Sequence, residues 1–579
     1  MKTLLKTSFT KILAACLLAV SLFSGAVQAA EPKPVLTISI SSYLSVLEAG
    51  KAIANQIGQG DVYGMFQALF GALPGVDNTK PLGFVLFATE EEFLPVVFLP
   101  VTDLKKFTDA YPIVDSYLSE QMDEVGPGKY SLSGPIELIL EQKKNWLILY
   151  PESYPKLAVD DPSTYLDGLN KKYLLALHVN FENAPKELIL QTISGVEMLM
   201  SIMNPDAAQQ FATVKESVEL LLDEGKWLLE GLNIDTKTAD ITGEVAMEVK
   251  PTGIFAEALK YQKDGKTNFI GFFRPEQAMA AVGIGLIPDA QKETQINQIK
   301  GYFASAAEGV EYELEGDELE FVQGIIESVE EIVVATIEAG KTDGAISLKS
   351  TGEIFFGGRV AKGNLLGDVF KKTAAGISEA APETKSLFKL EYTSFEGYKF
   401  SSLALPFNVI SSLAPNAADL PEHLEGKSVN LLLGVKDDAV CGVIGTDASK
   451  LETILKKCIT DSKTPAALPK TSFVFSLPLT AGAMESLGFL PPEPPVVAVQ
   501  EVLKNAPKDA TITAEDDITI SSQSVKNVIK VNISGKIIAA IAKAVTAGNE
   551  AQMQSALNSD PFEDSPKTQN RERTRDFNF

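Results

Sequence analysis

The chain has 579 residues, 45% of them hydrophobic, and a formal net charge of −25 at pH 7. An apolar fraction of this size excludes an intrinsically disordered protein, and the length suggests more than one domain. The negative charge repels phosphate backbones, so we expect no nucleic acid partner.

Residues 1–29 have the pattern of a secretory signal peptide. Lysines in MKTLLKTSFTK precede a mostly apolar run from Ile12 to Leu22, and the small residues of VQAA suit cleavage after Ala29. No later run reaches the roughly 18 apolar residues that a membrane span requires. We therefore expect an exported protein, periplasmic or extracellular, with no transmembrane segment in the mature chain.

A lipoprotein signal is the rival interpretation of the same segment. The residues Leu13-Ala14-Ala15-Cys16 resemble a lipoprotein box, which would place an acyl chain on Cys16. Only Ile12 separates this box from Lys11, so no apolar core precedes it. The pattern favours cleavage after Ala29.

Two later segments are nearly the same. ESVELLLDEGKWLLEG (216–231) and ESVEEIVVATIEAGKTDG (327–344) both place apolar residues at i, i+3 and i+4, which predicts a helix that ends near Gly231 or Gly340. In each copy a pair of alternating strands and a second helix are predicted to follow. A third version, without the first helix, spans residues 516–545.

Other phrases also recur along the chain. Three segments each predict an apolar strand, a proline near the turn and a helix. They are residues 173–190, 267–284 and 471–489. Residues 83–107 and 430–455 each predict a hairpin followed by a helix. Thr102-Asp103 and Thr446-Asp447 stand where a side-chain oxygen caps the helix N-terminus, a position that favours Asp and Thr.

These phrases predict an α+β fold of two related domains. Each domain is expected to be a mainly antiparallel sheet covered by amphipathic helices and built from repeated hairpin-helix and strand-helix units, with similar parts in different order. The predicted boundaries are 30–265 for the N-terminal domain and 266–548 for the C-terminal domain. Residues 549–579 are predicted to be a disordered polar tail.

Cys441 and Cys458 are the two cysteines that remain after signal cleavage. The first lies on a predicted strand and the second near the end of the following helix, which would allow the helix to fold back. An exported chain permits a disulfide between them, but the sequence does not supply the Cα separation that a bond requires. The alternatives of a structural bond and two free thiols stay open, and a catalytic thiol is not expected.

No catalytic motif occurs in the chain. It has two histidines, His178 and His423, which excludes HExxH and three-histidine zinc sites. His178 is expected on a partly exposed strand face and His423 in a solvated loop. The acidic stretches GDELE (316–320) and AEDD (514–517) lack the ligand spacing of an EF-hand, so we expect no metal site there. We predict no catalytic, cofactor-binding or metal-binding residues.

The order of several phrases resembles that of the large, uncharacterised exported proteins of planctomycete-type bacteria. The matching phrases are FLPVTDLKKF, NWLILYPESYPKL, DPSTYLDGLNKKYLLALHVNFENAPKELI and GLNID. In those proteins we expect a tyrosine-aspartate pair at the start of this strand. The present chain has Tyr173 at that place but lacks the aspartate. The resemblance implies location and architecture, and it carries over no catalytic residue.

Two function classes follow from the sequence. The first is a non-catalytic exported protein that binds an envelope protein or a small apolar ligand, or contributes to an envelope assembly. The second is a secreted or periplasmic hydrolase with an unrecognised acid-dependent site. The absence of a catalytic constellation favours the first class.

Overall fold

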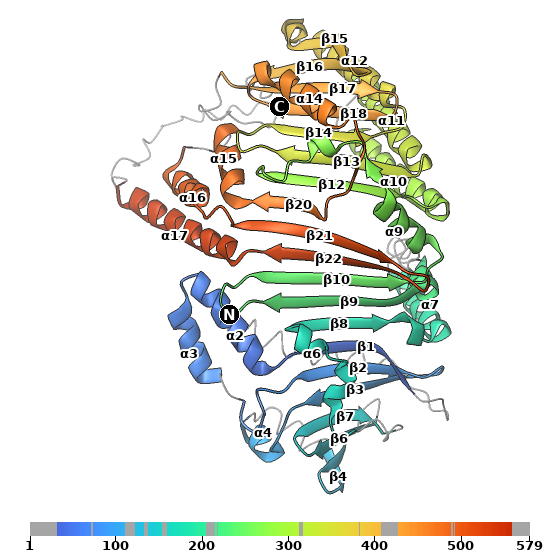
Figure 1. Ribbon diagram of the computed structural model, residues 1–579, viewed down its shortest axis with the longest axis vertical. Helices are drawn as coiled ribbons and strands as arrows, with labels where there is room; N and C mark the ends of the chain where they lie inside the picture. Colours follow the sequence, from blue (N-terminus) through green and yellow to red (C-terminus); the bar gives the residue numbers. More distant parts are fainter. Residues whose placement is uncertain are drawn as a thin grey trace, which may run out of the picture.

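The computed structural model describes residues 32–558 except 71–72, 111–121, 133–136, 153–158, 204–214, 217, 312–315, 381, 407–425, 488–489 and 491. Helices are combined with one large antiparallel sheet of 20 strands (Figure 1). The predicted α+β class is confirmed at this level.

The strands of residues 33–249 are β1 (Lys33–Ile40), β2 (Leu82–Ala88), β3 (Phe93–Leu99), β4 (Met122–Gly126), β5 (Lys129–Leu132), β6 (Leu138–Lys143), β7 (Trp146–Pro151), β8 (Leu175–Asn180), β9 (Gly225–Ile234) and β10 (Ile241–Val249). Those of residues 279–533 are β12 (Met279–Leu286), β13 (Lys341–Leu348), β14 (Ile354–Arg359), β15 (Phe388–Phe395), β16 (Tyr398–Pro406), β17 (Ser428–Lys436), β18 (Ala439–Gly445), β20 (Thr471–Ser476), β21 (Thr511–Ile520) and β22 (Val525–Ile533). A separate small sheet pairs β11 (Lys266–Thr267) with β19 (Ala466–Ala467).

The helices lie between these strands along the chain. The α-helices are α2 (Tyr43–Gln56), α3 (Gly60–Phe70), α4 (Leu104–Ala110), α6 (Leu169–Lys172), α7 (Lys186–Met203), α9 (Ile254–Asp264), α10 (Asp289–Glu311), α11 (Asp317–Glu338), α12 (Gly363–Ala380), α14 (Ala448–Asp461), α15 (Leu477–Leu487), α16 (Pro494–Lys504) and α17 (Gly535–Asn558). Short 3-10 helices are η2 (Pro162–Leu166), η3 (Phe181–Asn183), η4 (Ile270–Phe272) and η5 (Pro382–Leu387).

The sheet is centred on the pairing of β10 with β22, which joins the two halves of the chain edge to edge. Outward from β10 the order is β9, β8, β1, β2, β3, β7, β6, β5, β4. Outward from β22 the order is β21, β20, β12, β13, β14, β18, β17, β16, β15. Along the chain, the strands of both halves therefore take equivalent positions in the sheet in the same order. The sequence analysis predicted a different order in the two halves.

Each half has a buried core on one side of its outer strands. In the first half, Val85, Val96 and Ile148 pack against the chain around Leu166, in η2. In the second half, Phe272 from η4 and Leu455 from α14 pack against strands of residues 280–443. Apolar side chains from well-separated parts of the sequence thus stabilise each half by burial.

The helix caps predicted at the two Thr-Asp pairs are confirmed for the aspartates. The backbone N–H of Lys106 donates to Asp103 Oδ1 at 3.0 Å at the start of α4. Asp447 accepts from the backbone N–H of Ser449 at the start of α14. Each carboxylate satisfies a backbone donor that has no partner within its helix.

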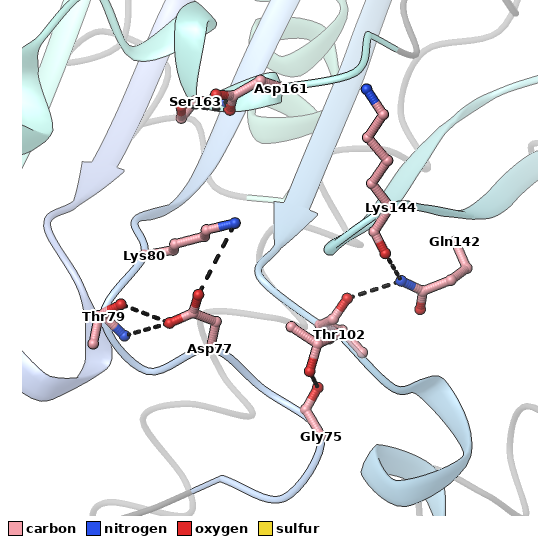
Figure 2. Close-up of polar contacts among 10 residues, drawn as sticks. Gly75, Asp77, Thr79, Lys80, Thr102, Gln142, Lys144, Asp161 and Ser163 are labelled. Carbon is pink, nitrogen blue, oxygen red and sulfur yellow. Dashed lines mark hydrogen bonds and ion pairs between the residues drawn. The ribbon is translucent and has the colours of Figure 1, made fainter.

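Thr102 has a different role, which Figure 2 shows. Its hydroxyl donates to the Gly75 carbonyl at 3.1 Å, and the Gln142 side-chain amide donates to the Val101 carbonyl at 2.8 Å. Nearby, Asp77 Oδ1 accepts from both the backbone N–H and the hydroxyl of Thr79. These contacts connect the loops before β2 and after β3 with the end of β6.

Two local predictions were wrong. The helix containing residue 216 does not extend to Gly231, because β9 begins at Gly225. Gly231 is instead a point of close approach, since an added Cβ would lie 2.3 Å from Tyr173 Cε1. Residues 279–286, within a predicted helix, form β12, which pairs with β13 and β20. Gly340 ends its helix as predicted, with φ +69°.

The predicted disordered tail begins too early. Helix α17 continues to Asn558, so residues 549–558 are helical, and residues 559–579 lie outside the described residues. The segment AQMQSAL contains good helix formers, which explains why the helix continues after the apolar periodicity weakens. Residues 1–29 also lie outside the described part.

The helices were also searched for membrane spans. Among the residues that the structure describes, none of the helices combines the length and the apolar character needed to cross a bilayer.

The close contact between Gly231 and Tyr173 gives a test of the fold. We expect Gly231→Ala to lower the free energy of unfolding by about 1–3 kcal/mol, because the added methyl group overlaps the buried tyrosine ring. Gly243→Ala is the matched control on the neighbouring strand, since an added Cβ there meets nothing within 4 Å. Urea unfolding followed by circular dichroism measures both variants. Equal stability of the two would contradict the packing described.

Candidate functional site

The register of the strands assigns each side chain to one face of the sheet. Successive residues of a strand point to opposite faces, and residues paired across strands share a face. Val245 on β10 pairs with Glu230 on β9 and with Ile529 on β22, and Ile529 pairs with Asp516 on β21. These four residues therefore form one row across four strands.

One face of strands β8, β9, β10, β22 and β21 is almost entirely apolar, and we call it the apolar face. Its three residues that are not apolar are Glu230, Asp516 and Asn527. Its apolar members are Leu175, Leu177, Val179, Leu228, Leu232, Ile234, Ile241, Gly243, Val245, Met247, Val249, Ile512, Ala514, Ile518, Ile520, Val525, Ile529, Val531 and Ile533.

Several large side chains on the apolar face are exposed. The exposed fraction is 44% for Val245, 42% for Leu175, 40% for Ile520, 38% for Ile529 and 37% for Val531. An antiparallel sheet usually places polar side chains on its solvent-exposed face. The exposure of a nearly continuous apolar face is therefore a feature that folding alone does not explain.

The opposite face of the same strands is largely polar, and we call it the polar face. Glu244 lies at its centre and is 9% exposed. Its Oε1 accepts from Lys172 Nζ at 2.8 Å and from the Tyr173 hydroxyl at 2.7 Å, and Lys530 Nζ lies 3.7 Å from its Oε2. Burial alone raises the pKa of Glu244, but these hydrogen bonds and the two lysine charges together lower it below its usual range.

Helices cover the apolar face at both ends of its strands. At one end α9 packs Phe255 and Leu259 against Met247 and Ile518. At the other end Ile537 of α17 packs close to Ile512. Figure 1 shows α15, α16 and α17 along one end of the strands and α7 and α9 along the other.

The middle of the apolar face consists of two rows, which we call the open strip, and α9 reaches its Asp516 end through Gln262. The residues of these rows are Leu175, Leu232, Gly243, Val531 and Ala514 in the first and Leu177, Glu230, Val245, Ile529 and Asp516 in the second.

The first row continues into the second half of the chain. Ala514 pairs with Phe473, Phe473 with Ala281, and Ala281 with Ile346 on β13. Gly283 and Gly344 pair beside this row, and a hollow of ≈ 420 Å³ is lined by Ala281, Val282, Gly283, Gly344, Ala345 and Ile346. Small residues thus leave space next to the apolar row.

The structure does not bring the two histidines into a common site. His178 lies on the polar face of β8, with its ring 5.9 Å from that of Trp227. Burial lowers the pKa of His178 and outweighs the opposing charge of Asp167. His423 lies outside the described residues. No described group of three or more His, Cys, Asp or Glu residues is arranged to hold a metal ion.

The two cysteines lie in the same buried core of the second half. Cys441 is on β18 and Cys458 on α14, and both are free thiols in the structure. Burial raises the pKa of Cys458 to about 11 and that of Cys441 further above its usual range. Such thiols are unreactive at neutral pH. A disulfide between them stays a prediction.

Sequence analysis did not identify the residues of the open strip. The alternation of Val245 with Met247, and of Ile529 with Val531, is visible in the sequence and predicts strands with one apolar face. The sequence pattern does not show that β10 pairs with β22. This pairing places both sets of apolar residues on one surface. Glu230 and Asp516 enter the same row only through that pairing.

Comparisons of this chain with family profiles, with curated proteins and with solved structures found no match. The site is therefore interpreted from its own geometry.

The network at Glu244 predicts a pH dependence of stability. Because its pKa is lowered in the folded state, its contribution is present above the pKa of an unfolded glutamate, about 4.3, and is lost as the pH falls through the folded pKa. We expect Glu244→Gln to reduce the free energy of unfolding by roughly 2 kcal/mol at pH 7 and by less at pH 3.5.

The matched control is Glu230→Gln. Glu230 precedes Gly231, the residue that pairs with Glu244, and it lies on the apolar face. We expect this variant to show a smaller loss of stability at pH 7, since the Glu230 side chain is exposed. Urea unfolding at both pH values measures the difference. A loss in Glu244→Gln that is unchanged at low pH would refute the charged network.

Proposed function

We propose that this chain is a non-catalytic binding protein whose open strip holds the hydrocarbon part of a small amphipathic ligand. The observation that carries the proposal is the exposure of Leu175, Val245, Ile529 and Val531 on an almost entirely apolar face. A ligand that covers these side chains would remove their apolar surface from water, which contributes about 25 cal/mol per Å².

The distribution of polar residues supports this proposal. The polar face carries the buried, hydrogen-bonded Glu244, whereas the exposed open strip carries mainly aliphatic side chains. Exposed apolar patches of this kind mark ligand or partner surfaces in soluble proteins. A sheet selected for stability alone would have polar residues in the open strip.

The dimensions suit an extended apolar chain. From β8 to β13 the first row crosses seven strand spacings of about 4.8 Å, which gives a length of roughly 34 Å. The two rows of the open strip are separated by two residues along each strand, or about 7 Å. The surface is therefore long and narrow.

The hydrolase alternative receives less support from the open strip. Glu230 and Asp516 lie three strand spacings apart, which places their Cα atoms about 14 Å from each other. The paired carboxylates of glycoside hydrolases are separated by about 5–9.5 Å. We therefore propose a binding role and not an acid-dependent reaction at this surface.

We further propose that the protein is exported and that it consists of two related domains, near residues 30–265 and 266–548. The signal-like residues 1–29 support export. The equivalent strand order of the two halves supports an internal duplication. On this proposal the open strip is formed where the two copies join, with its ligand lying across both.

Binding of a pure hydrocarbon probe tests the function. We expect diphenylhexatriene to bind the wild-type protein with increased fluorescence. Val245→Thr combined with Ile529→Thr should weaken binding about tenfold, because the first change replaces a methyl group by a hydroxyl and the second replaces an ethyl group by a hydroxyl at the centre of the open strip. Both replacements stay β-branched, so the strands are retained.

The control variant is Val125→Thr, on β4, where the side chain is 52% exposed but lies far outward in the strand order from the open strip. This change should leave probe binding as in the wild type. If the wild type does not bind the probe, or if the control weakens binding as much as the double variant, the proposed function is wrong.

A further inference from the structure

Helix α17 is longer than its counterpart in the first half of the chain. It follows β22 as α9 follows β10, so the two helices hold equivalent positions in the two halves. Helix α9 has 11 residues and α17 has 24, and none of the large apolar side chains of α9, which the structure describes from end to end, is exposed. The additional length of α17, which Figure 1 shows beside α16, is therefore not explained by covering the sheet.

One side of α17 presents apolar side chains to solvent, and we call these four residues the α17 stripe. Their exposed fractions are 49% for Ile541, 56% for Val545, 67% for Met553 and 81% for Leu557. Their spacings are multiples of four residues, so they form one row along the helix. The helix packs against the rest of the chain through other positions, among them Ile537. The α17 stripe is thus an apolar helix face without a partner among the described residues.

The chain leaves the described part of the structure directly after the α17 stripe. Residues 559–579, which we call the C-terminal segment, follow the last residue of α17. The rise of an α-helix is about 1.5 Å per residue, so Ile541 and Leu557 are roughly 24 Å apart along the axis. An extended chain covers about 3.3 Å per residue, so the segment can reach roughly 70 Å. Its length is therefore ample to fold back over the whole α17 stripe.

The C-terminal segment combines aromatic and basic side chains. Its apolar rings are those of Phe562, Phe577 and Phe579. It also contains three of the five arginines of the chain, and these lie at positions 571, 573 and 575. Aromatic rings bury large apolar areas, and guanidinium groups bind carboxylates. The segment thus has the two kinds of side chain that an apolar stripe beside acidic residues would bind.

The charges next to the α17 stripe are acidic. Beyond Lys543 the charged residue of α17 is Glu550, one turn before Met553. Helix α16, which packs against α17, contributes Glu501 and has Glu493 at its N-cap. These three carboxylates are exposed, and no ion pair joins them to another described residue. They complement the arginines of the C-terminal segment.

The covalent connection favours this segment over a second copy of the chain. A segment tethered next to its binding surface meets it at an effective concentration in the millimolar range. Two copies of the chain repel each other, because each carries a net charge of −25.

We propose that the C-terminal segment folds back along α17 and covers the α17 stripe. Its phenylalanine rings pack on the apolar side chains, and its arginines pair with the carboxylates of α16 and α17. The α17 stripe is on this proposal a docking surface for the chain's own C-terminal segment. The proposal does not depend on a ligand of the open strip.

Limited trypsin digestion of the protein with its complete C-terminus tests this contact. We expect Val545→Gln combined with Met553→Gln to speed cleavage after the three arginines of the segment about fivefold, because cleavage follows the population of the undocked segment. Glutamine is a good helix former and both side chains are exposed, so α17 is retained. Intact mass measured over time gives the cleavage rate.

The matched control is Val62→Gln combined with Met65→Gln on α3. The exposed fractions of these residues are 54% and 70%, close to those of Val545 and Met553. The control should be cleaved at the wild-type rate. Equal cleavage rates in the wild type and both double variants would overturn the proposal, as would equal acceleration by the two double variants.

A thiol on the α17 stripe tests the contact from the other side. The two native cysteines are buried and have raised pKa values, so a maleimide reagent labels a new exposed thiol selectively. We expect Phe577→Ser with Phe579→Ser to speed labelling of a Met553→Cys variant about fivefold, and to leave labelling of a Met65→Cys variant unchanged. An unchanged rate for Met553→Cys would contradict the docking of these rings.

Two further measurements identify other occupants. A dimer in sedimentation velocity that dissociates in the Val545→Gln and Met553→Gln variant would assign the α17 stripe to a second copy. Co-flotation with phosphatidylcholine vesicles that is lost in the same variant would assign it to a membrane surface. Either result would overturn the proposal, whereas a monomer that does not float with vesicles and shows the expected cleavage and labelling supports it.

Discussion

The backbone pairing of β10 with β22 is the interaction on which the rest of the structure depends. It runs in register from Ile241 with Ile533 to Val249 with Val525, without a bulge. Because side chains alternate along a strand, a shift of one residue in this pairing would move Val245 and Ile529 to opposite faces. The uninterrupted register therefore determines both the continuity of the sheet and the composition of the apolar face.

The two faces of the central strands differ in how their side chains are accommodated. On the polar face, Glu244 has oppositely charged and hydrogen-bonding neighbours close enough to compensate for its burial. On the apolar face the helices pack over the strand ends and leave the middle rows uncovered. Closer approach of α9 and α17 would bury these rows.

Local features of the fold could be predicted from the sequence, because they depend on neighbouring residues. Asp103 and Asp447 cap helices that begin directly after them, and Gly340 ends the helix before it. Gly231 was misassigned since its reason lies in Tyr173, which a separate segment brings over the strand. Strand β12 was predicted as a helix because its alanines and glycines become a strand only between β13 and β20. The open strip was missed for the same physical reason, as it exists only when distant strands pair.

The distance along the chain between the central strands has a consequence for how the protein folds. Thr242 and Asn532 meet across β10 and β22 although 290 positions separate them in the sequence. Until the last strands have been synthesised, β10 is an edge strand with unpaired backbone groups beside an exposed apolar surface. Contacts of such long range form slowly, and partly folded chains with open edges aggregate. The junction that completes the apolar face is therefore also the part of the chain that most needs protection before folding ends.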